Sequence, residues 1–572
     1  MNPFLAAANA VTMNAAYVLG TVFRHELESK SRRGQETGER LLKKVLRENR
    51  NSEFGRKHGF ADIHSVEEFR ARVPLSVYED YEDYIRRTRE TGEQNLMTSH
   101  RVVFLAATSG TTSKYKFIPQ TNGGYVAYFK IICIALTLLR KQLKRRGYST
   151  LTARGLVLVN MSHHDIGKPE GEGIPVGMVS SFGADSVAIF LPVATPYPKE
   201  LNAGRHLPDT RYLKCLFGLR DPDLKFTNAP YASGMMDVFN YLLEHSEELV
   251  NDIERGGIRA SEPLSPALRA RLSRKLPPDP KRARELREIF AHPERGPVLS
   301  RVWPMMSLII TAGGGEFALH ARQIHELFDP DVAICQSGYV ASECTMGVAL
   351  TLEEPVYSLL PGSAYYEFLP VVDGVVQTDR VLTAQEVVPG EYYEVVITTN
   401  AGLYRYRMRD IVCIDGFEGT MPLLRFSHRS QYITDFLSMH LSSEQLGRSV
   451  MEAAEPLNVH IADFCLRVIK EGRLPYFELF VEPEQPLTPE QREAFAEAFE
   501  KRLNANSWDY EELRRDGDIG PTRLRVLQPG AFRRYREKCV AEGASASQIK
   551  TMRRIDTPEK LAFFESEEEK DA

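Results

Sequence analysis

A run of small residues, Thr108–Ser113, carries five hydroxyls and one glycine directly after an apolar stretch. Hydroxyls and backbone N–H groups can surround phosphate oxygens, and glycine allows the main chain to approach them closely. The run lacks the G-x-x-x-x-G-K-[ST] pattern of a P-loop, and Ser/Thr/Gly runs are usually plain loops. Ser109, Gly110, Thr111 and Thr112 are therefore a candidate phosphate-binding loop whose role depends on the rest of the chain.

Two further clusters follow apolar segments. Gly313, Gly314 and Gly315 end one of them, and they form either a tight turn or a bare backbone surface for an adenine ring. About twenty residues later, Tyr339, Ser342 and Glu343 supply an aromatic face, a hydroxyl and a carboxylate. An aromatic face for a base and a carboxylate for Mg²⁺ are the groups that bound ATP requires.

Two charged residues near other motifs complete the set. Asp410 stands beside three arginines in GLYRYRMRD, where it belongs to a salt-bridge network or holds ribose hydroxyls. Lys550 lies in the small-residue stretch GASASQIKT. A lone lysine is ordinarily a surface residue, but in a loop that begins with glycine it can also act as a mobile catalytic cation.

Alternating strand-like and helical segments are expected to position these residues. This alternation predicts an α/β fold with a large N-terminal domain. The expected strands are 101–107, 155–159, 186–193, 307–312 and 331–339, and the expected helices are 126–139, 233–250 and 318–328. The stretch 251–297 is expected to be a surface helical insertion with little core.

The second half of the chain has a different texture. Short β-like runs from 356 to 414 predict a small, mainly antiparallel β subdomain. From 430 onward, helices at 444–454 and 489–505 alternate with strand-like runs. We expect an N-terminal domain over 1–429 and a smaller α+β domain over 430–572, which contains Lys550.

Composition narrows the classes of partner. The formal net charge of the 572 residues is -5 and the pI is near 6.3, which gives no reason to expect a nucleic-acid partner. Seven cysteines occur singly, which favours a reducing cytoplasm.

Residues 1–23 carry no charged side chain, but Asn9, Thr12 and Asn14 interrupt the apolar run. A packed or surface helix is favoured there, and a membrane anchor is the alternative.

Four motifs in this order resemble one known family. TSGTTSKYKFIP, GYVASE, GLYRYRMRD and SASQIKTMR are similar to motifs of the auxin-responsive Gretchen Hagen (GH3) family of acyl-acid amido synthetases, within the adenylate-forming superfamily. The resemblance covers nearly the whole chain. It implies a monomeric enzyme that uses ATP and Mg²⁺ to adenylate a small carboxylic acid, and then transfers the acyl group to an amine, such as an amino acid.

The resemblance also implies a role for each matching residue. The phosphate-binding motif corresponds to Ser109, Gly110, Thr111 and Thr112. The adenine and metal motif corresponds to Tyr339, Ser342 and Glu343. The ribose-binding aspartate corresponds to Asp410, the arginine near the hinge to Arg429, and the catalytic lysine to Lys550. Three positions depart from the family pattern: Val340 replaces a small residue, Arg409 a glycine and Met552 a proline. Val340 and Arg409 are expected to narrow or recharge the nucleotide site.

Other functions stay open at this point. A ligase with a thiol acceptor would share the adenylation half, and a catalytically silent relative would act as a binding protein. His163-His164-Asp165 is read as a loop and not as a condensation-domain motif, and no G-x-S-x-G esterase motif is present. The sequence names no residue of the acid pocket.

Overall fold

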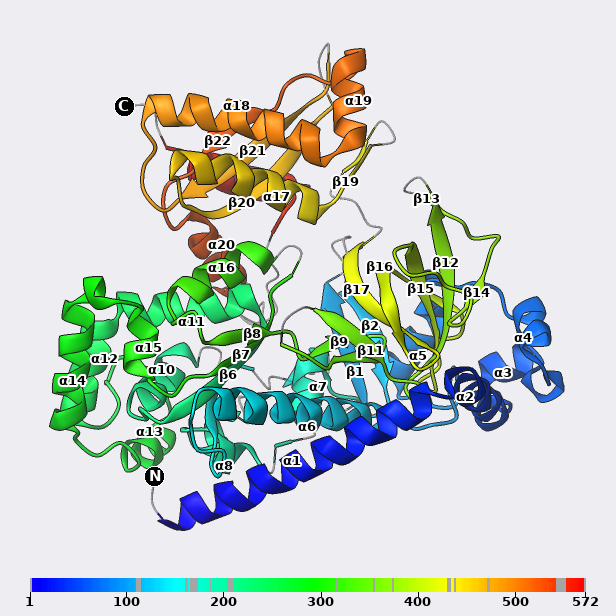
Figure 1. The fold of residues 1–572 in the computed structure, drawn as a ribbon, viewed down its shortest axis with the longest axis horizontal. Coiled ribbons are helices and arrows are strands. Elements are labelled where there is room, and N and C mark those ends of the chain that lie inside the picture. Colours follow the sequence, from blue (N-terminus) through cyan, green and yellow to red (C-terminus); the bar gives the residue numbers. More distant parts are fainter. Residues whose placement is uncertain are drawn as a thin grey trace. The chain divides into compact units, whose positions relative to one another are not determined.

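A computed structural model describes most of the chain (Figure 1). The described residues are 3–109, 115–159, 163–164, 173–185, 187–188, 190–202, 210–314, 317–352, 355–372, 375–429, 434–436, 439–470, 474–541 and 552–569. The chain forms two compact units: Met1–Pro230, Val238–Ala312 and His325–Ser427 make up the first, and Tyr231–Asp237, Gly313–Ile324 and His428–Ala572 the second. The expected boundary near residue 430 stays a prediction about domains.

A parallel sheet of four strands lies in the first unit. Its order is β3 (Arg154–Val157), β6 (Leu224–Tyr231), β7 (Leu308–Ala312) and β8 (Ala333–Cys335). Strands were predicted at β3, β7 and β8, but β6 was not. Its sequence, LKFTNAPY, has no apolar run, and its polar side chains bond to backbone instead. Thr227 Oγ1 donates to Leu156 O at 3.0 Å, and Lys225 Nζ donates to Thr152 O at 2.6 Å.

Two of the strand predictions need correction. The described part of 186–193 contains no strand, and α8 (Leu191–Ala194) begins there instead. Pro192 at the start of α8 cannot donate to a sheet ladder, and its fixed φ suits the first turn of a helix. The predicted strand 331–339 is divided between β8 and β9 (Gly338–Val340), which belong to different sheets.

The antiparallel region predicted for 356–414 is confirmed and is larger than expected. The strand order is β13-β12-β15-β16-β17-β11-β10-β9, with β14 paired to β12. Beyond β9, the strands are β10 (Thr345–Ala349), β11 (Val356–Leu359), β12 (Tyr365–Val372), β13 (Val375–Val376), β14 (Leu382–Thr383), β15 (Tyr392–Thr398), β16 (Tyr406–Glu418) and β17 (Met421–Arg429).

A third sheet has the order β2-β1-β5-β4. Its strands are β1 (Phe104–Ser109), β2 (Tyr115–Gln120), β4 (His163–His164) and β5 (Val176–Gly177). The hydroxyl-rich run therefore connects two antiparallel strands, because Ser109 pairs with Tyr115. The expected order of strand, loop and helix is interrupted by β2. His163 and His164, expected in a loop, form a short strand against β5.

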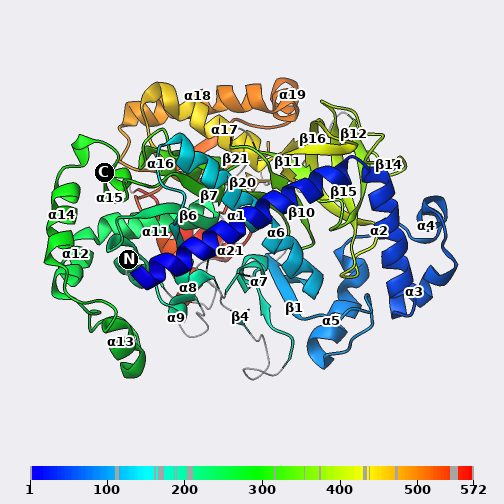
Figure 2. The ribbon, with the colours of Figure 1, turned by 60° about the horizontal axis from the view of Figure 1, so that its bottom comes forward.

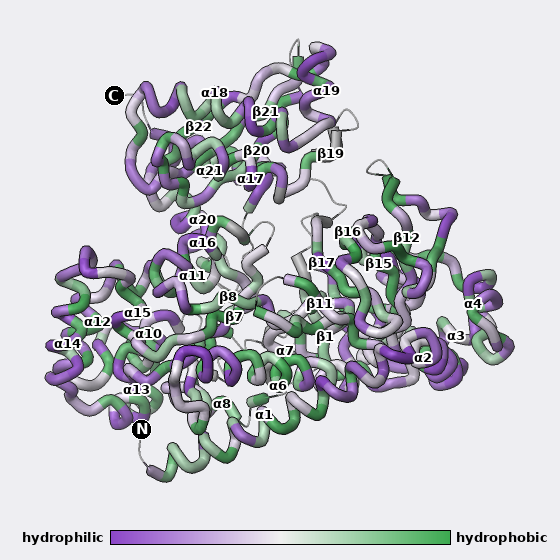
Figure 3. The backbone as a smooth tube through the Cα atoms, viewed as in Figure 1, coloured by the Kyte–Doolittle hydropathy of each residue, from purple (hydrophilic) through white to green (hydrophobic). Residues whose placement is uncertain are grey.

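Two long helices lie side by side in the first unit, α1 (Pro3–Ser31) and α6 (Asn122–Arg145) (Figures 1 and 2). They pack closely at Gly20, where an added Cβ would lie 2.1 Å from Cys133 O. Apolar colour extends along much of α1, and Val11, Val18 and Val22 are exposed (Figure 3). Within the described residues, α1 and α6 are the helices whose length and hydropathy would suffice to cross a membrane, a weak criterion that core helices also meet.

The helices between β6 and β7 differ from expectation in two ways. The predicted helix 233–250 is interrupted at His245 and forms α11 (Ala232–Glu244) and α12 (Ser246–Arg255). The insertion also has a core, because Leu272 of α13 (Pro266–Ser273) and Leu286 of α14 (Pro280–Ala291) are fully buried. Helix α10 (Arg211–Leu219) precedes β6, α15 (Val298–Val302) precedes β7, and α16 (Ala318–Glu326) follows it.

The second unit is α+β, as predicted. Strand β21 (Tyr476–Pro483) pairs antiparallel with β20 (Ile461–Ile469) and parallel with β22 (Arg523–Val526). The expected helices are α17 (Ser443–Ala454) and α18 (Pro489–Asn506), each begun by a capping box. Three more helices follow, α19 (Trp508–Asp516), α20 (Ala531–Ala541) and α21 (Pro558–Ser566).

Candidate active site

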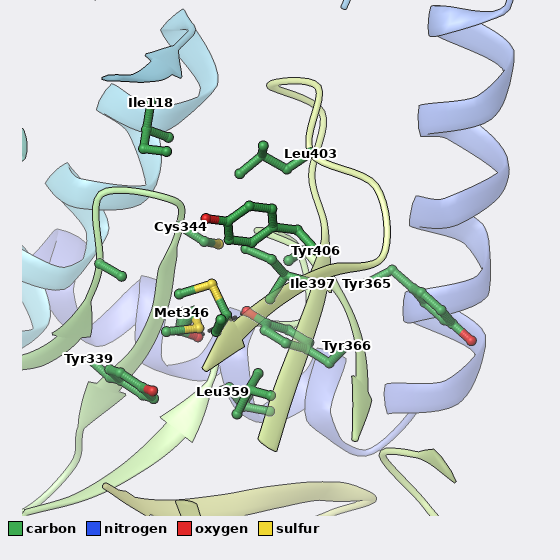
Figure 4. Close-up of a cluster of buried hydrophobic side chains, with 14 of the residues drawn as sticks. Ile118, Tyr339, Cys344, Met346, Leu359, Tyr365, Tyr366, Ile397, Leu403 and Tyr406 are labelled. Carbon is green, nitrogen blue, oxygen red and sulfur yellow. Dashed lines mark hydrogen bonds between the residues drawn. The ribbon is translucent and has the colours of Figure 1, made fainter. Parts of the chain in front are cut away.

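Tyr339 and Asp410, which the sequence singled out separately, meet inside the antiparallel sheet. The Tyr339 hydroxyl donates a hydrogen bond to Asp410 Oδ2 at 2.8 Å. Asp410 is only 2% exposed, and Tyr339 lies edge-on to Phe426 with ring centroids 5.9 Å apart. Figure 4 shows Tyr339 in the buried cluster that also contains Met346 and Leu359. A buried carboxylate that is held by a phenol can accept further hydrogen bonds from a ligand's hydroxyls.

A bulge in β16 determines where Asp410 lies. Glu394 pairs with Ile411 and Val396 pairs with Arg407, so one residue of β15 faces three residues of β16. Arg409, within the bulge, has a φ of 56°, in the left-handed region that favours glycine. This backbone conformation explains why glycine suits the position before the aspartate. Such bulges redirect side chains next to active sites.

The neighbouring arginines have structural partners. Arg405 Nε donates to Glu367 Oε2 at 3.1 Å, and Arg407 donates twice to Glu394, at 2.9 and 2.8 Å. The salt-bridge interpretation of this motif therefore describes Arg405 and Arg407. Asp410 accepts a hydrogen bond from the hydroxyl of Tyr339.

Ser342 and Glu343 lie at the tip of the hairpin between β9 and β10. Its turn is closed by Ala341 N, which donates to Cys344 O at 3.0 Å. Gln120 Nε2 at the end of β2 donates to Ser342 O at 2.7 Å. This bond connects the strand that follows the hydroxyl-rich run to the hairpin that carries Glu343. Sequence reasoning missed Gln120, whose only signal was its place between that run and α6.

Val340 does not lie with Tyr339. It packs against an apolar cluster that includes Leu27 of α1 and Ile131 of α6. Neighbouring residues of a strand point to opposite faces, so Val340 faces the helices on the side away from Tyr339. Val340 therefore lies on the face of the strand opposite Tyr339, and the expectation that it narrows the nucleotide site stays a prediction.

The remaining predicted site residues are described incompletely. Gly110, Thr111, Thr112, Gly315 and Lys550 lie outside the described residues. For Ser109 and Arg429 the structure describes the backbone, at the ends of β1 and β17.

The strand that leads to the glycine cluster offers one group for a ligand. An added Cβ at Gly314 would have no neighbour within 4 Å, so the fold leaves open space there. Thr311 Oγ1 is buried and has no hydrogen-bond partner among the described residues. A buried hydroxyl without a partner costs free energy unless a ligand or water satisfies it.

The described residues contain no group of three or more His, Cys, Asp or Glu side chains that could bind a metal ion by themselves. Mg²⁺ in nucleotide sites is bound by one or two carboxylates together with substrate phosphates and water. The half-buried Glu343 fits that donor set, whereas a Zn²⁺ site would need more protein ligands.

Comparison with solved structures defines the class of fold. AtGH3.15 acyl acid amido synthetase in complex with 2,4-DB matches with a TM-score of 0.83 over 96% of both chains, at 23% identity. A 2-hydroxyisobutyryl-CoA ligase in the postadenylation state, in complex with 2-HIB-AMP, matches with a TM-score of 0.50 at 12% identity, over 92% of this chain and 90% of that one. The chain therefore shares its fold with AtGH3.15 acyl acid amido synthetase and, less closely, with 2-hydroxyisobutyryl-CoA ligase.

Family models place the chain more narrowly. The GH3 family N-terminal domain matches residues 23–333, the central domain 357–429 and the C-terminal domain 444–559. Indole-3-acetic acid-amido synthetase GH3.8 of Oryza sativa subsp. indica is 26% identical, over 92% of this chain and 89% of its own. Probable indole-3-acetic acid-amido synthetase GH3.11 of Oryza sativa subsp. japonica is 27% identical, over 95% of each. This chain belongs to the GH3 family.

Proposed function

We propose that this protein is an ATP-dependent acyl-acid amido synthetase, which adenylates a small carboxylic acid and then transfers the acyl group to an amine, such as an amino acid. The observation that supports the proposal is the Tyr339–Asp410 hydrogen bond, because it joins two motifs for which the resemblance implies nucleotide roles, in a chain of this family. Tyr339 would lie against adenine and Asp410 would accept the ribose hydroxyls. Ser342 would complete the same site.

In the first step, a carboxylate oxygen of the acid attacks the α-phosphorus of ATP. The new O–P bond forms as the bond to the β-phosphate oxygen breaks, and pyrophosphate leaves. Lys550 would balance charge on the α-phosphate and the reacting carboxylate, while Ser109, Gly110, Thr111 and Thr112 would hold the phosphates. Mg²⁺, bound through Glu343, would supply charge neutralisation of the phosphates.

In the second step, an amine nitrogen attacks the acyl carbon. The C–N bond forms, the C–O bond to AMP breaks, and the proton lost by the amine goes to solvent. The lid domain, turning about a hinge near Arg429, would remove Lys550 between the two steps. Gly314 and Gly315 would form the surface next to adenine.

A thiol such as coenzyme A is the alternative acceptor, since the first step would be identical. An acceptor screen that compares mixed amino acids with thiols under the same conditions distinguishes these two functions. A silent relative would bind ATP and release no pyrophosphate. We further propose a cytoplasmic monomer with no nucleic-acid partner. The seven cysteines all lie within described residues and none is in a disulfide, which fits a reducing compartment.

The test is a pyrophosphate-release assay over a panel of carboxylic acids, including indole-3-acetic acid and 2,4-DB, the compounds named in the relatives. Mass spectrometry of reactions with mixed amino acids then identifies the amide. Acid-dependent release with amide formation supports the proposal. Pyrophosphate release with thioester formation would identify a thiol as the acceptor. ATP binding without pyrophosphate release for any acid would refute the proposal that the protein is an enzyme.

A further inference from the structure

A buried ion pair between Arg553 and Asp463 lies in the second unit. Arg553 follows Lys550 in the sequence. Arg553 and Asp463 are each 5% exposed, and Arg553 Nη1 donates to Asp463 Oδ1 at 2.6 Å. The same nitrogen donates to Phe464 O at 2.8 Å, and the guanidinium lies 4.0 Å from the centre of the Phe464 ring. Burying two charges costs free energy that an apolar pair would not, so such a pair is weak evidence for stability and is better suited to specifying one arrangement.

The backbone around Arg553 is held in a single register. Leu466 N on β20 donates to Arg553 O, and Ile555 N donates to Leu466 O, both at 2.9 Å. Ile555 also packs in an apolar cluster with Phe532 and Phe564. Residues 553–555 therefore run beside the edge of β20. The Arg553–Asp463 ion pair fixes the register between this segment and the strand.

Lys550 lies three residues before Arg553 in the sequence. A slip of one residue would move the chain by about 3.3 Å and turn its side chains to the opposite face. A misplacement of about 1 Å can cost about 100-fold in rate. The position of a catalytic lysine is therefore sensitive to the register of this segment.

We propose that Asp463 and Arg553 are positioning residues for the adenylation step, which fix the segment that carries Lys550 to β20. The inference rests on the proposed function, and it assigns a role to two residues outside the motifs of the nucleotide site. The pair acts in the first step alone, since the second step does not use Lys550.

The other groups around Asp463 leave Arg553 as its cationic partner. His320 Nε2 on α16 is 3.9 Å from Asp463 Oδ2, and burial lowers the pKa of His320 to about 4. His320 is therefore neutral at pH 7. The nearby Arg536 is paired with Asp237 at 2.6 Å. Asp463 has no second full charge competing for it among these contacts.

The test uses two conservative variants of the full chain, Arg553→Lys and Asp463→Asn. Arg467→Gln is the matched control, because Arg467 also lies on β20 and forms a 3.1 Å ion pair, with Glu478 of β21 and not with the 553–555 segment. Three quantities are measured: pyrophosphate release with the most active acid of the panel, ATP affinity by calorimetry, and amide formation from the chemically prepared acyl-adenylate of that acid. Melting curves identify any variant that has unfolded, and the other variant then decides.

Both variants are expected to lower kcat for pyrophosphate release by about 100-fold. ATP affinity and amide formation from the acyl-adenylate should stay within about threefold, and the control should match the unaltered chain.

Equal losses in pyrophosphate release and in amide formation from the acyl-adenylate would overturn the positioning role. A folded Arg553→Lys or Asp463→Asn variant as active as the unaltered chain would do the same and leave the proposed function intact. An unaltered chain that releases no pyrophosphate with any acid would overturn both.

Discussion

Replacing Asp410 by asparagine removes the charge from a side chain that is 2% exposed and keeps its shape. If the carboxylate accepts both ribose hydroxyls of ATP, the amide oxygen can replace it for only one of them. A hydrogen bond to a charged group contributes about 1.5–3 kcal/mol, so the affinity for ATP should fall about 10- to 150-fold. The Tyr339 hydroxyl can still donate to the remaining oxygen, which should preserve the local fold.

Calorimetry with ATP and 2′-deoxy-ATP measures this effect directly. The unaltered chain should prefer ATP by about tenfold, and Asp410→Asn should lose most of that preference. Asp415→Asn is the matched control, because Asp415 lies on the same strand and pairs with Arg425 at 2.6 Å. An unchanged preference for ATP in a folded Asp410→Asn variant would refute the ribose role.

Three further predictions concern other parts of the chain. Lys550→Ala should abolish acid-dependent pyrophosphate release while calorimetry shows unchanged ATP binding, and unaltered release would remove Lys550 from the mechanism. Arg409→Gly should raise the melting temperature, since it relieves about 1–2 kcal/mol of left-handed strain, whereas Arg405→Gly, at a φ of 48°, should lower it through loss of a buried ion pair. The second unit should lose stability as pH falls from about 6.5 towards 4, by up to about 1.4 kcal/mol per pH unit, because buried His320 has a pKa lowered to about 4 and binds its proton only on unfolding. His320→Gln should reduce the dependence of the melting temperature on pH over that range. An unchanged dependence would contradict the attribution of this effect to His320.

Local sequence pattern predicted the elements that have a strong local signal. Helix α18 has such a signal, because Thr488, Pro489 and Gln491 form a capped helix start. Strand β6 was missed because its burial depends on polar side chains that bond to neighbouring backbone, and no local pattern shows those partners. The segment at 186–193 was assigned from apolar content, although Pro192 indicated a helix start.

The site was predictable as separate motifs and not as an arrangement. Tyr339 and Asp410 are 71 residues apart, and their hydrogen bond depends on strand order and on the bulge at Arg409. Gln120 was missed because its partner, Ser342, is 222 residues away. The face on which Val340 lies followed from strand alternation, but only once the strand and its neighbours were placed.

Acid-dependent exchange of labelled pyrophosphate into ATP tests the central claim most directly, because it reports the first step alone. With a suitable carboxylic acid and no amine, the protein should incorporate label into ATP, and omission of the acid should abolish incorporation. No exchange with any acid of the panel, from a folded protein that binds ATP, would contradict the assignment of this chain as an adenylating enzyme.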